Sequence, residues 1–111
     1  MKFPRRSRGL HSGEEAKQWA SLRFEPHLQP LAAWVAELIR DIAGVEWSAI
    51  EPAATFISDL RMDELEPVEM VMAIESELGI SVPDEDAESL ATVADLIGYL
   101  DRRLSSEAGG R

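Results

Sequence analysis

The sequence predicts an all-α fold with three longer helices and one short helix. Two observations point to it: apolar residues recur at helical spacing in three separate segments, and Gly44 and Gly79 stand where two of these segments end. A chain of 111 residues has room for one small domain with tails. With 45% hydrophobic but only 6% aromatic residues, we expect a modest core of mainly aliphatic side chains.

Residues 1–28 are expected to form a basic, partly disordered extension. Between Met1 and Phe24 the basic residues outnumber the acidic ones: Lys2, Arg5, Arg6, Arg8, Lys17 and Arg23 against Glu14 and Glu15. Disorder is expected from Met1 to His11, because this stretch is short, basic and interrupted by proline and glycine. Two interpretations stay open: a solvated tail, or a basic head that folds back on the acidic helix or binds something else.

A short helix is predicted within this extension. Ser12 and Glu15 have the spacing of a capping box, in which each side chain accepts a hydrogen bond from the other's amide, and the helix would run to about Leu22. Its apolar residues on or near one face are Ala16, Trp19, Ala20 and Leu22. This is too little for a stable isolated helix, so an ordered segment implies that Trp19 and Phe24 dock on the main domain.

Residues 29–104 are expected to form the main domain, starting with a helix that ends near Ala43. Pro30 suits the first turn of that helix and Gly44 its stop. Its apolar face is made of Leu31, Val35, Leu38, Ile39 and Ile42. A long loop follows from Val45 to Ser58, with Ile50 and Phe56 as its expected core anchors.

The next helix carries two apolar stripes. A helix tolerates proline only in its first turn, so Pro67 indicates that this helix begins at Glu64 or slightly later. Gly79 is expected to end it. The stripe expected to enter the core is Met70, Val71, Ile74 and Leu78. The second stripe, Leu65, Val68 and Met72, is interleaved with Glu66, Glu69 and Glu75. Such a stripe rimmed by carboxylates is typical of a protein-docking surface, although a crowded bundle can also bury part of it.

The C-terminal part predicts one short and one longer helix. Asp84 to Leu90 is expected to be a short acidic turn or helix after an extended connector. Thr92 can cap the last helix, with Asp95 favouring its positive end. The apolar face of that helix is Val93, Leu96, Ile97, Leu100 and Leu104. Residues 105–111 are polar and contain glycine, so we expect a flexible tail.

Charge and composition exclude several classes of partner and site. A net charge of -10 disfavours nucleic acid and anionic membranes and favours a basic protein partner. The absence of cysteine excludes disulfides and thiolate metal sites. No apolar run approaches the roughly 20 residues of a membrane span, and no secretory signal is present, which predicts a cytoplasmic protein. The acidic run at Asp84 lacks the alternation and glycine of a calcium loop, so no metal is expected.

From about Leu31 to Arg103 the chain resembles the acyl carrier proteins. In that family Asp-Leu-Gly is followed two residues later by Asp-Ser-Leu, and here Asp59-Leu60-Arg61 is followed by Asp63-Glu64-Leu65. Further matching pieces are Gly44-Val45, Ile50, Ala54-Thr55-Phe56, Val68-Glu69, Val71-Met72-Ala73, Ile80, Val82-Pro83-Asp84-Glu85, Glu88, Thr92-Val93 and Tyr99. The resemblance implies a bundle of three longer helices and one short helix, with a long loop between the first two.

The departures lie at the family's attachment site. Arg61 stands where the family prefers glycine, and Glu64 stands where the family's serine accepts 4'-phosphopantetheine. A carboxylate cannot form that phosphodiester, and neither Ser58 nor Ser76 lies in the motif. We therefore expect no attached cofactor. Glu64 has two interpretations: its charge imitates part of the missing phosphate, or it is a favourable first-turn residue that replaced a serine no longer needed.

Three functional hypotheses follow. The first is a noncatalytic module of fatty acid, lipid or polyketide synthesis that docks as a monomer on a basic partner. Its candidate contacts are Asp63, Glu64, Leu65, Glu66, Val68, Glu69 and Met72. The second is a genuine acyl carrier with an altered attachment site, and the third is noncovalent binding of an apolar ligand between the helices. No enzymatic activity is expected, because His11 and His27 lie in the tail and at a proline-flanked join, away from any readable nucleophile.

Overall fold

The computed structural model describes residues 12–109, and over this range the fold is all-α, as predicted. The helices are α1 (Glu14–Ser21), α2 (Gln29–Ala43), α3 (Glu66–Leu78), α4 (Asp84–Glu88) and α5 (Val93–Gly109), with short 3-10 turns at Pro26–Leu28 and Trp47–Ala49. No strand occurs within these residues. The disorder expected for Met1 to His11 falls outside the described part of the chain.

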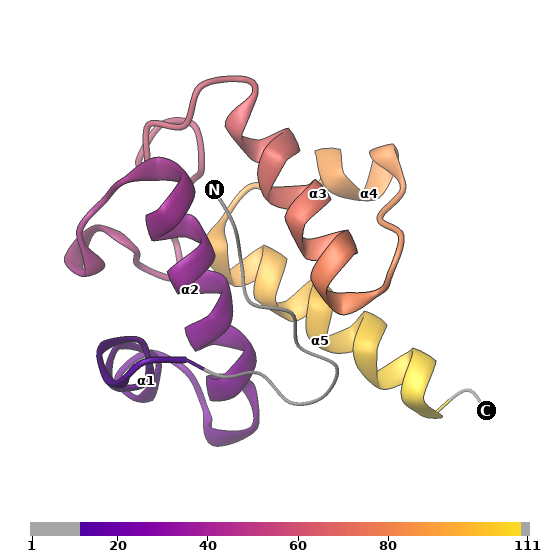
Figure 1. Ribbon diagram of the computed structural model, residues 1–111, viewed down its shortest axis with the longest axis horizontal. Coiled ribbons are helices and arrows are strands. Elements are labelled where there is room, and N and C mark those ends of the chain that lie inside the picture. The colour runs from indigo at the N-terminus through magenta and orange to yellow at the C-terminus, as the bar shows by residue number, and fades with distance from the viewer. Residues whose placement is uncertain (1–11, 110–111) are drawn as a thin grey trace.

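Helix α2 is the centre of the fold. Figure 1 shows α1 on one side of α2, with α3 and α5 on the other, and α2 contacts all three. Val35, Leu38 and Ile39 are fully buried along it. Pro30 lies in its first turn, and Gly44 ends it in the left-handed conformation with φ 69°, which glycine adopts without the steric cost of a Cβ.

Helix α1 is part of the same hydrophobic core. Trp19 is buried and its indole Nε1 donates a 2.8 Å hydrogen bond to the carbonyl oxygen of Ile50. Its ring lies 5.7 Å from that of Phe24 and 6.4 Å from that of Trp47, centroid to centroid. The prediction that Trp19 and Phe24 dock on the main domain is confirmed, and residues on both sides of the expected boundary at 28/29 share one core.

The start and end of α1 differ from the prediction. The predicted capping box does not form: Gly13 is the N-cap, and the Ser12 hydroxyl has no hydrogen-bond partner among the described residues. Instead, Glu37 of α2 accepts a 2.8 Å hydrogen bond from the Gly13 amide, so a tertiary contact replaces the local cap. Leu22 follows the last helical residue and is 75% exposed rather than on the buried face.

The long loop between α2 and α3 packs its own apolar residues. Ile50 and Phe56 are buried, as predicted, and Leu60 and Met62 are buried as well. An isolated antiparallel bridge joins Thr55 to Thr92 at the start of α5. This packing accounts for the length of the loop and holds its end close to α3 and α5.

The C-terminal helices follow the prediction in order and type, but α5 is longer. At its start Thr92 Oγ1 accepts from the Asp95 amide at 3.1 Å and the Asp95 carboxylate accepts from the Thr92 amide at 3.2 Å, which completes the predicted cap. The prediction of a flexible tail from residue 105 onward is wrong for residues 105–109, because α5 continues to Gly109. Residues 105–109 contain no proline, so no missing amide proton interrupts the helix there.

Candidate functional site

The candidate site starts just before α3, where the Asp63 side chain closes the turn that leads into the helix. Its Oδ1 accepts hydrogen bonds of 2.9 Å from the amides of both Leu65 and Glu66. In return, Glu66 Oε1 accepts from the Asp63 amide at 3.2 Å. This reciprocal pattern closes the turn just before α3, whose N-cap residue is Leu65, and Pro67 follows in the first helical turn, where its missing amide proton costs nothing. The helix begins at Glu66, slightly later than Glu64, as expected.

Arg61 precedes this turn in a backbone conformation that favours glycine. Its φ of 60° is the only positive value of a non-glycine residue within residues 12–109. The left-handed region costs an L-residue with a side chain roughly 1–2 kcal/mol. The loop therefore holds Arg61 in a conformation that glycine would adopt without this cost.

Glu64 follows Asp63 with an exposed side chain. Unlike Asp63 and Glu66, it makes no hydrogen bond or ion pair with any described residue. Its carboxylate is close to the positive end of the α3 dipole, where a negative charge is favourable by about 0.3–1 kcal/mol. Its side chain offers a carboxylate and no hydroxyl.

The second apolar stripe of α3 is exposed. Leu65, Val68 and Met72 are 66%, 54% and 61% exposed, whereas Met70 and Ile74 on the other face are buried. The bundle thus covers only a part of this stripe, and each of its three side chains stays more than half exposed. Val71 and Leu78, which the sequence also assigned to the core face, are only half-buried.

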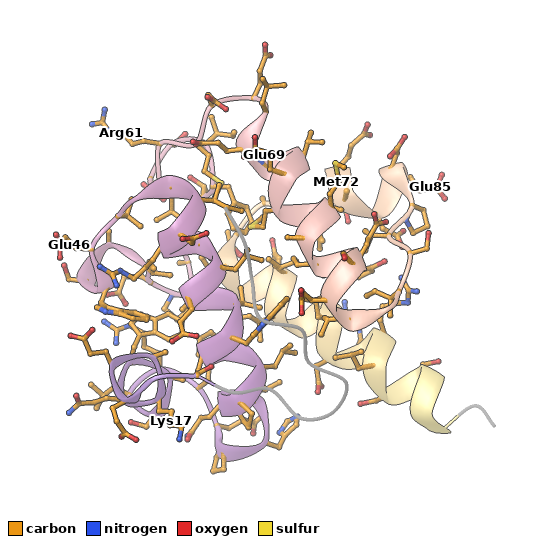
Figure 2. All side chains as sticks on the ribbon, viewed as in Figure 1. Lys17, Glu46, Arg61, Glu69, Met72 and Glu85 are labelled. Atoms are coloured by element: carbon orange, nitrogen blue, oxygen red, sulfur yellow. The ribbon has the colours of Figure 1, made fainter. Side chains whose placement is uncertain are left out.

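Carboxylates surround this stripe. Figure 2 shows Glu69 and Met72 of α3 and Glu85 of α4 along the same edge of the molecule. Asp63, Glu64 and Glu69 are exposed, Glu66 is half-buried, and Asp63 and Glu66 also bond to each other in the turn before α3. We call Glu64, Leu65, Val68, Glu69 and Met72 the α3 face. The predicted contact residues thus come together, divided into an exposed group and a pair that also fixes the helix start.

A groove lies between α3, α4 and α5, and the sequence did not reveal it. Its volume is about 360 Å³. Its apolar lining comes from Phe56, Pro67, Val68, Met70, Val71, Met72, Val82, Ala87, Leu90 and Leu96. Val68 and Met72 belong to both the groove and the α3 face, so the two are continuous. Helix α4 has only five residues and contributes the small side chain of Ala87 to the groove. So short a helix shows no apolar periodicity, and the sequence therefore did not predict this side of the groove.

The mouth of the groove is acidic. Glu75, Asp84 and Glu88 contribute to its lining, and Glu75 Oε2 also accepts a 2.7 Å hydrogen bond from the Val82 amide. These carboxylates repel an anionic headgroup. The groove therefore suits an uncharged apolar chain better than a free fatty-acid anion.

A hydrogen-bonded cluster attaches α4 to α5 beside the groove. The Tyr99 hydroxyl donates to Asp86 Oδ2 at 2.6 Å, and Arg103 Nη1 donates to the Tyr99 oxygen and to the Ser81 carbonyl, each at 2.8 Å. Burial raises the pKa of the Tyr99 hydroxyl above its usual 10.0, and its hydrogen bond to Asp86 raises it further. Tyr99 thus stays protonated and able to donate at neutral pH.

Two features are not found within the described part of the chain. No group of three or more His, Asp or Glu side chains there could hold a metal ion. Among the helices from residue 12 to 109, none is long and apolar enough to cross a membrane. The predicted cytoplasmic location is untested and stays a prediction.

Comparison with known proteins finds one family match and a clear relative. The family model for a phosphopantetheine attachment site matches residues 33–100. The chain is also 36% identical to the meromycolate extension acyl carrier protein of Mycolicibacterium aurum over 74 residues, which cover 67% of this chain and 76% of that protein. Helix α1 lies outside the matched range of the family model.

These matches correct the expectation that no cofactor belongs to the chain, since they indicate a 4'-phosphopantetheine-binding family. The resemblance of the sequence pairs Glu64 with the family's serine, and the exposed Glu64 side chain is a carboxylate without a hydroxyl.

Proposed function

The chain belongs to the acyl carrier protein family, and from that premise we propose that it serves fatty acid, lipid or polyketide synthesis by docking its α3 face on a basic partner protein. Members of this family are carriers and not catalysts, so the prediction that the chain is not an enzyme is confirmed. The similar protein of Mycolicibacterium aurum, a meromycolate extension carrier, supports a place in the synthesis of acyl chains.

The observation that carries this proposal is the exposed apolar stripe. Leu65, Val68 and Met72 are each more than half exposed on one side of a helix whose other side is buried. Removing such apolar surface from water favours association. An exposed stripe of this kind, bordered by charged residues, is typical of a protein interaction site.

The charges on the α3 face define the partner. Arg61 is the only basic residue between Asp59 and Asp101, so almost no positive charge balances the carboxylates of the α3 face. A partner with lysine or arginine residues around an apolar patch complements it. Such pairing steers the encounter and weakens as salt shortens the Debye length from about 10 Å at 0.1 M to about 3 Å at 1 M.

The test is a pull-down with the immobilised full chain at low ionic strength, followed by identification of the bound proteins by mass spectrometry. We expect basic enzymes or assembly proteins of acyl-chain synthesis. Glu69→Lys should reduce their recovery by at least about tenfold, because it places a like charge opposite the partner's cations.

Glu46→Lys is the matched control. Glu46 is also exposed but lies before the 3-10 turn at Trp47–Ala49, away from the α3 face (Figure 2). The same change in net charge there should leave recovery nearly unchanged. Equal losses with both variants, or no basic partner of acyl-chain synthesis at all, would contradict the proposal.

A second candidate function is noncovalent binding of an apolar ligand, which the groove favours. Its volume of about 360 Å³ falls within the roughly 300–1,000 Å³ of small-molecule sites. Titration with uncharged methyl decanoate should shift the amide resonances of Val71, Ala87 and Leu96, which line the groove. The decanoate anion should bind less well because of the acidic mouth. Shifts restricted to the α3 face, or no shifts at all, would argue against this function.

A further inference from the structure

Residues 1–11, which precede the described part of the chain, carry the positive charge that the α3 face lacks. They contain no acidic residue and four basic ones, Lys2, Arg5, Arg6 and Arg8. Apolar side chains such as those of Phe3 and Leu10 stand beside these charges. Basic residues next to apolar ones are also what the α3 face requires of a partner protein. The chain thus contains a segment whose chemistry complements its own α3 face.

The first described residues fix the point from which this segment starts. The Gly13 amide donates a 2.8 Å hydrogen bond to Glu37, which lies near the middle of α2. Helix α1, which follows, is held in the core by the buried Ala16 and Trp19. Residues 1–11 are therefore tethered to a fixed position on the domain. Such a tether gives them an effective concentration on the order of millimolar toward a surface within reach.

The segment is long enough to reach the α3 face. Figure 1 shows α1 and α3 on opposite sides of α2. Packed helices lie about 8–10 Å apart, so the path across α2 is roughly 20 Å, and the outer side of α3 adds roughly 10 Å. At about 3.3 Å per residue, Arg5 and Arg6 extend about 20–23 Å from Ser12, and Phe3 about 30 Å. The arginines are thus within reach of α3, and Phe3 is within reach of its exposed stripe.

The α3 face offers this segment carboxylates without partners. Glu64 and Glu69 are exposed, and neither side chain makes a hydrogen bond or an ion pair with any residue of the described range 12–109. Between them and beyond them lie the exposed Leu65 and Met72. Because Arg61 is the only basic residue from 59 to 101, the domain itself supplies almost no cation to this surface. Residues 1–11 are the densest group of positive charges in the chain.

We propose that residues 1–11 dock on the α3 face of the same molecule, with the arginines on its carboxylates and Phe3 on its apolar stripe, and thereby compete with the basic partner. The competition rests on the proposed function, whereas the contact itself needs no partner. A partner binds only molecules whose α3 face is free, so its apparent dissociation constant rises as that fraction falls. A contact formed in about nine-tenths of the molecules weakens partner binding about tenfold.

The first measurement is an NMR comparison of full-length proteins without any partner. In Arg5→Gln/Arg6→Gln the amide resonances of Leu65, Glu69 and Met72 should move relative to the parent, because the contact is weakened. Raising the salt concentration should move the same resonances of the parent in the same direction, since salt screens exposed charges. The variant should respond to salt less than the parent does.

Lys17→Gln/Arg102→Gln is the matched control, because it makes the same change in net charge at two exposed side chains outside the segment. Lys17 lies on α1, far from Glu69 and Met72 in Figure 2, and Arg102 belongs to the C-terminal half of α5. This control should leave the resonances of the α3 face close to those of the parent.

The apolar part of the contact is tested by Phe3→Ala. This variant should move the resonances of the apolar stripe in the same direction as the arginine variant. Leu22→Ala is its control, since Leu22 is 75% exposed at the end of α1 and its loss should leave the α3 face unchanged.

The second measurement is the affinity of the same proteins for the basic partner recovered in the pull-down. At low ionic strength Arg5→Gln/Arg6→Gln should bind it at least about threefold more tightly than the parent, and Lys17→Gln/Arg102→Gln should not. Movement of the α3 resonances without tighter binding would support the contact and overturn the competition. Failure of every protein to bind a basic partner would reject the proposed function and the competition with it.

The contact is judged without the partner. If the α3 resonances move no more in the arginine variant than in its control, the contact is refuted. Parent resonances that change with protein concentration would assign the contact to a second copy of the chain and overturn docking within one molecule.

Discussion

Substitution of Trp19 tests whether α1 is an integral part of the domain. The side chain is only 3% exposed, and its indole N–H is bonded to the Ile50 carbonyl at 2.8 Å in a buried position. Trp19→Ala removes the packing and the donor, which should cost about 3–5 kcal/mol of unfolding free energy. Trp19→Phe keeps a ring but leaves the buried carbonyl without its partner, which should cost about 1–3 kcal/mol.

The assay is urea unfolding followed by far-ultraviolet circular dichroism, and Trp47→Phe is the control. Trp47 is half-buried, and its indole bonds to the exposed Glu15 carboxylate at 3.3 Å, so its loss should cost less than about 1 kcal/mol. Because small domains are stable by about 5–15 kcal/mol, Trp19→Ala is expected to leave a marginal fold. A Trp19→Ala protein within about 1 kcal/mol of the parent would refute the conclusion that α1 belongs to the core.

Three further predictions concern the start of α3 and the α4 cluster. Asp63→Ala should lower the unfolding free energy by about 0.5–2 kcal/mol in a urea titration, and Asp63→Asn by much less because its side-chain oxygen can still accept from the Leu65 and Glu66 amides; equal losses would contradict the role of these bonds. Arg61→Gly should be more stable than Arg61→Ala by about 1 kcal/mol in the same assay, since φ is 60° there, and the reverse order would disprove the strain. The raised pKa of Tyr99 means that the unfolded chain loses this proton first, so its contribution to stability should be intact below about pH 10 and be lost as pH rises through the folded pKa. Tyr99 is the single tyrosine, so its phenolate absorbance reports that titration directly, and a titration at or below pH 10 would contradict the burial and the bond to Asp86.

Helical periodicity and glycine stops predicted most of the fold because they are local signals. Gly44 and Gly79 both end helices with φ 69°, and Ile50 and Phe56 anchor the loop as expected. The predictions that were wrong, such as the capping box at Ser12, concern contacts between residues far apart in the sequence. The N-terminus of α1 is fixed by Glu37 of another helix, and no pattern around Ser12 indicates that contact.

The exposed stripe of the candidate site could be predicted from the sequence because it, too, follows from helical periodicity. A helical projection separates Leu65, Val68 and Met72 from the core face, and these residues are exposed. It cannot show that Asp63 and Glu66 bond to each other, or that α4 packs beside α3 to form a groove. The hydrogen bond between Tyr99 and Asp86 joins α5 to α4, and a pattern within one helix cannot predict a contact between two helices.

The most direct test of the docking proposal is to map the bound surface by NMR when an identified basic partner is added to the isotope-labelled full chain. At low salt, we predict that the resonance changes concentrate on Leu65, Val68, Glu69 and Met72, and that they revert as salt is raised. Changes concentrated on α1 or on the exposed side of α5, or changes insensitive to salt, would contradict docking through the α3 face.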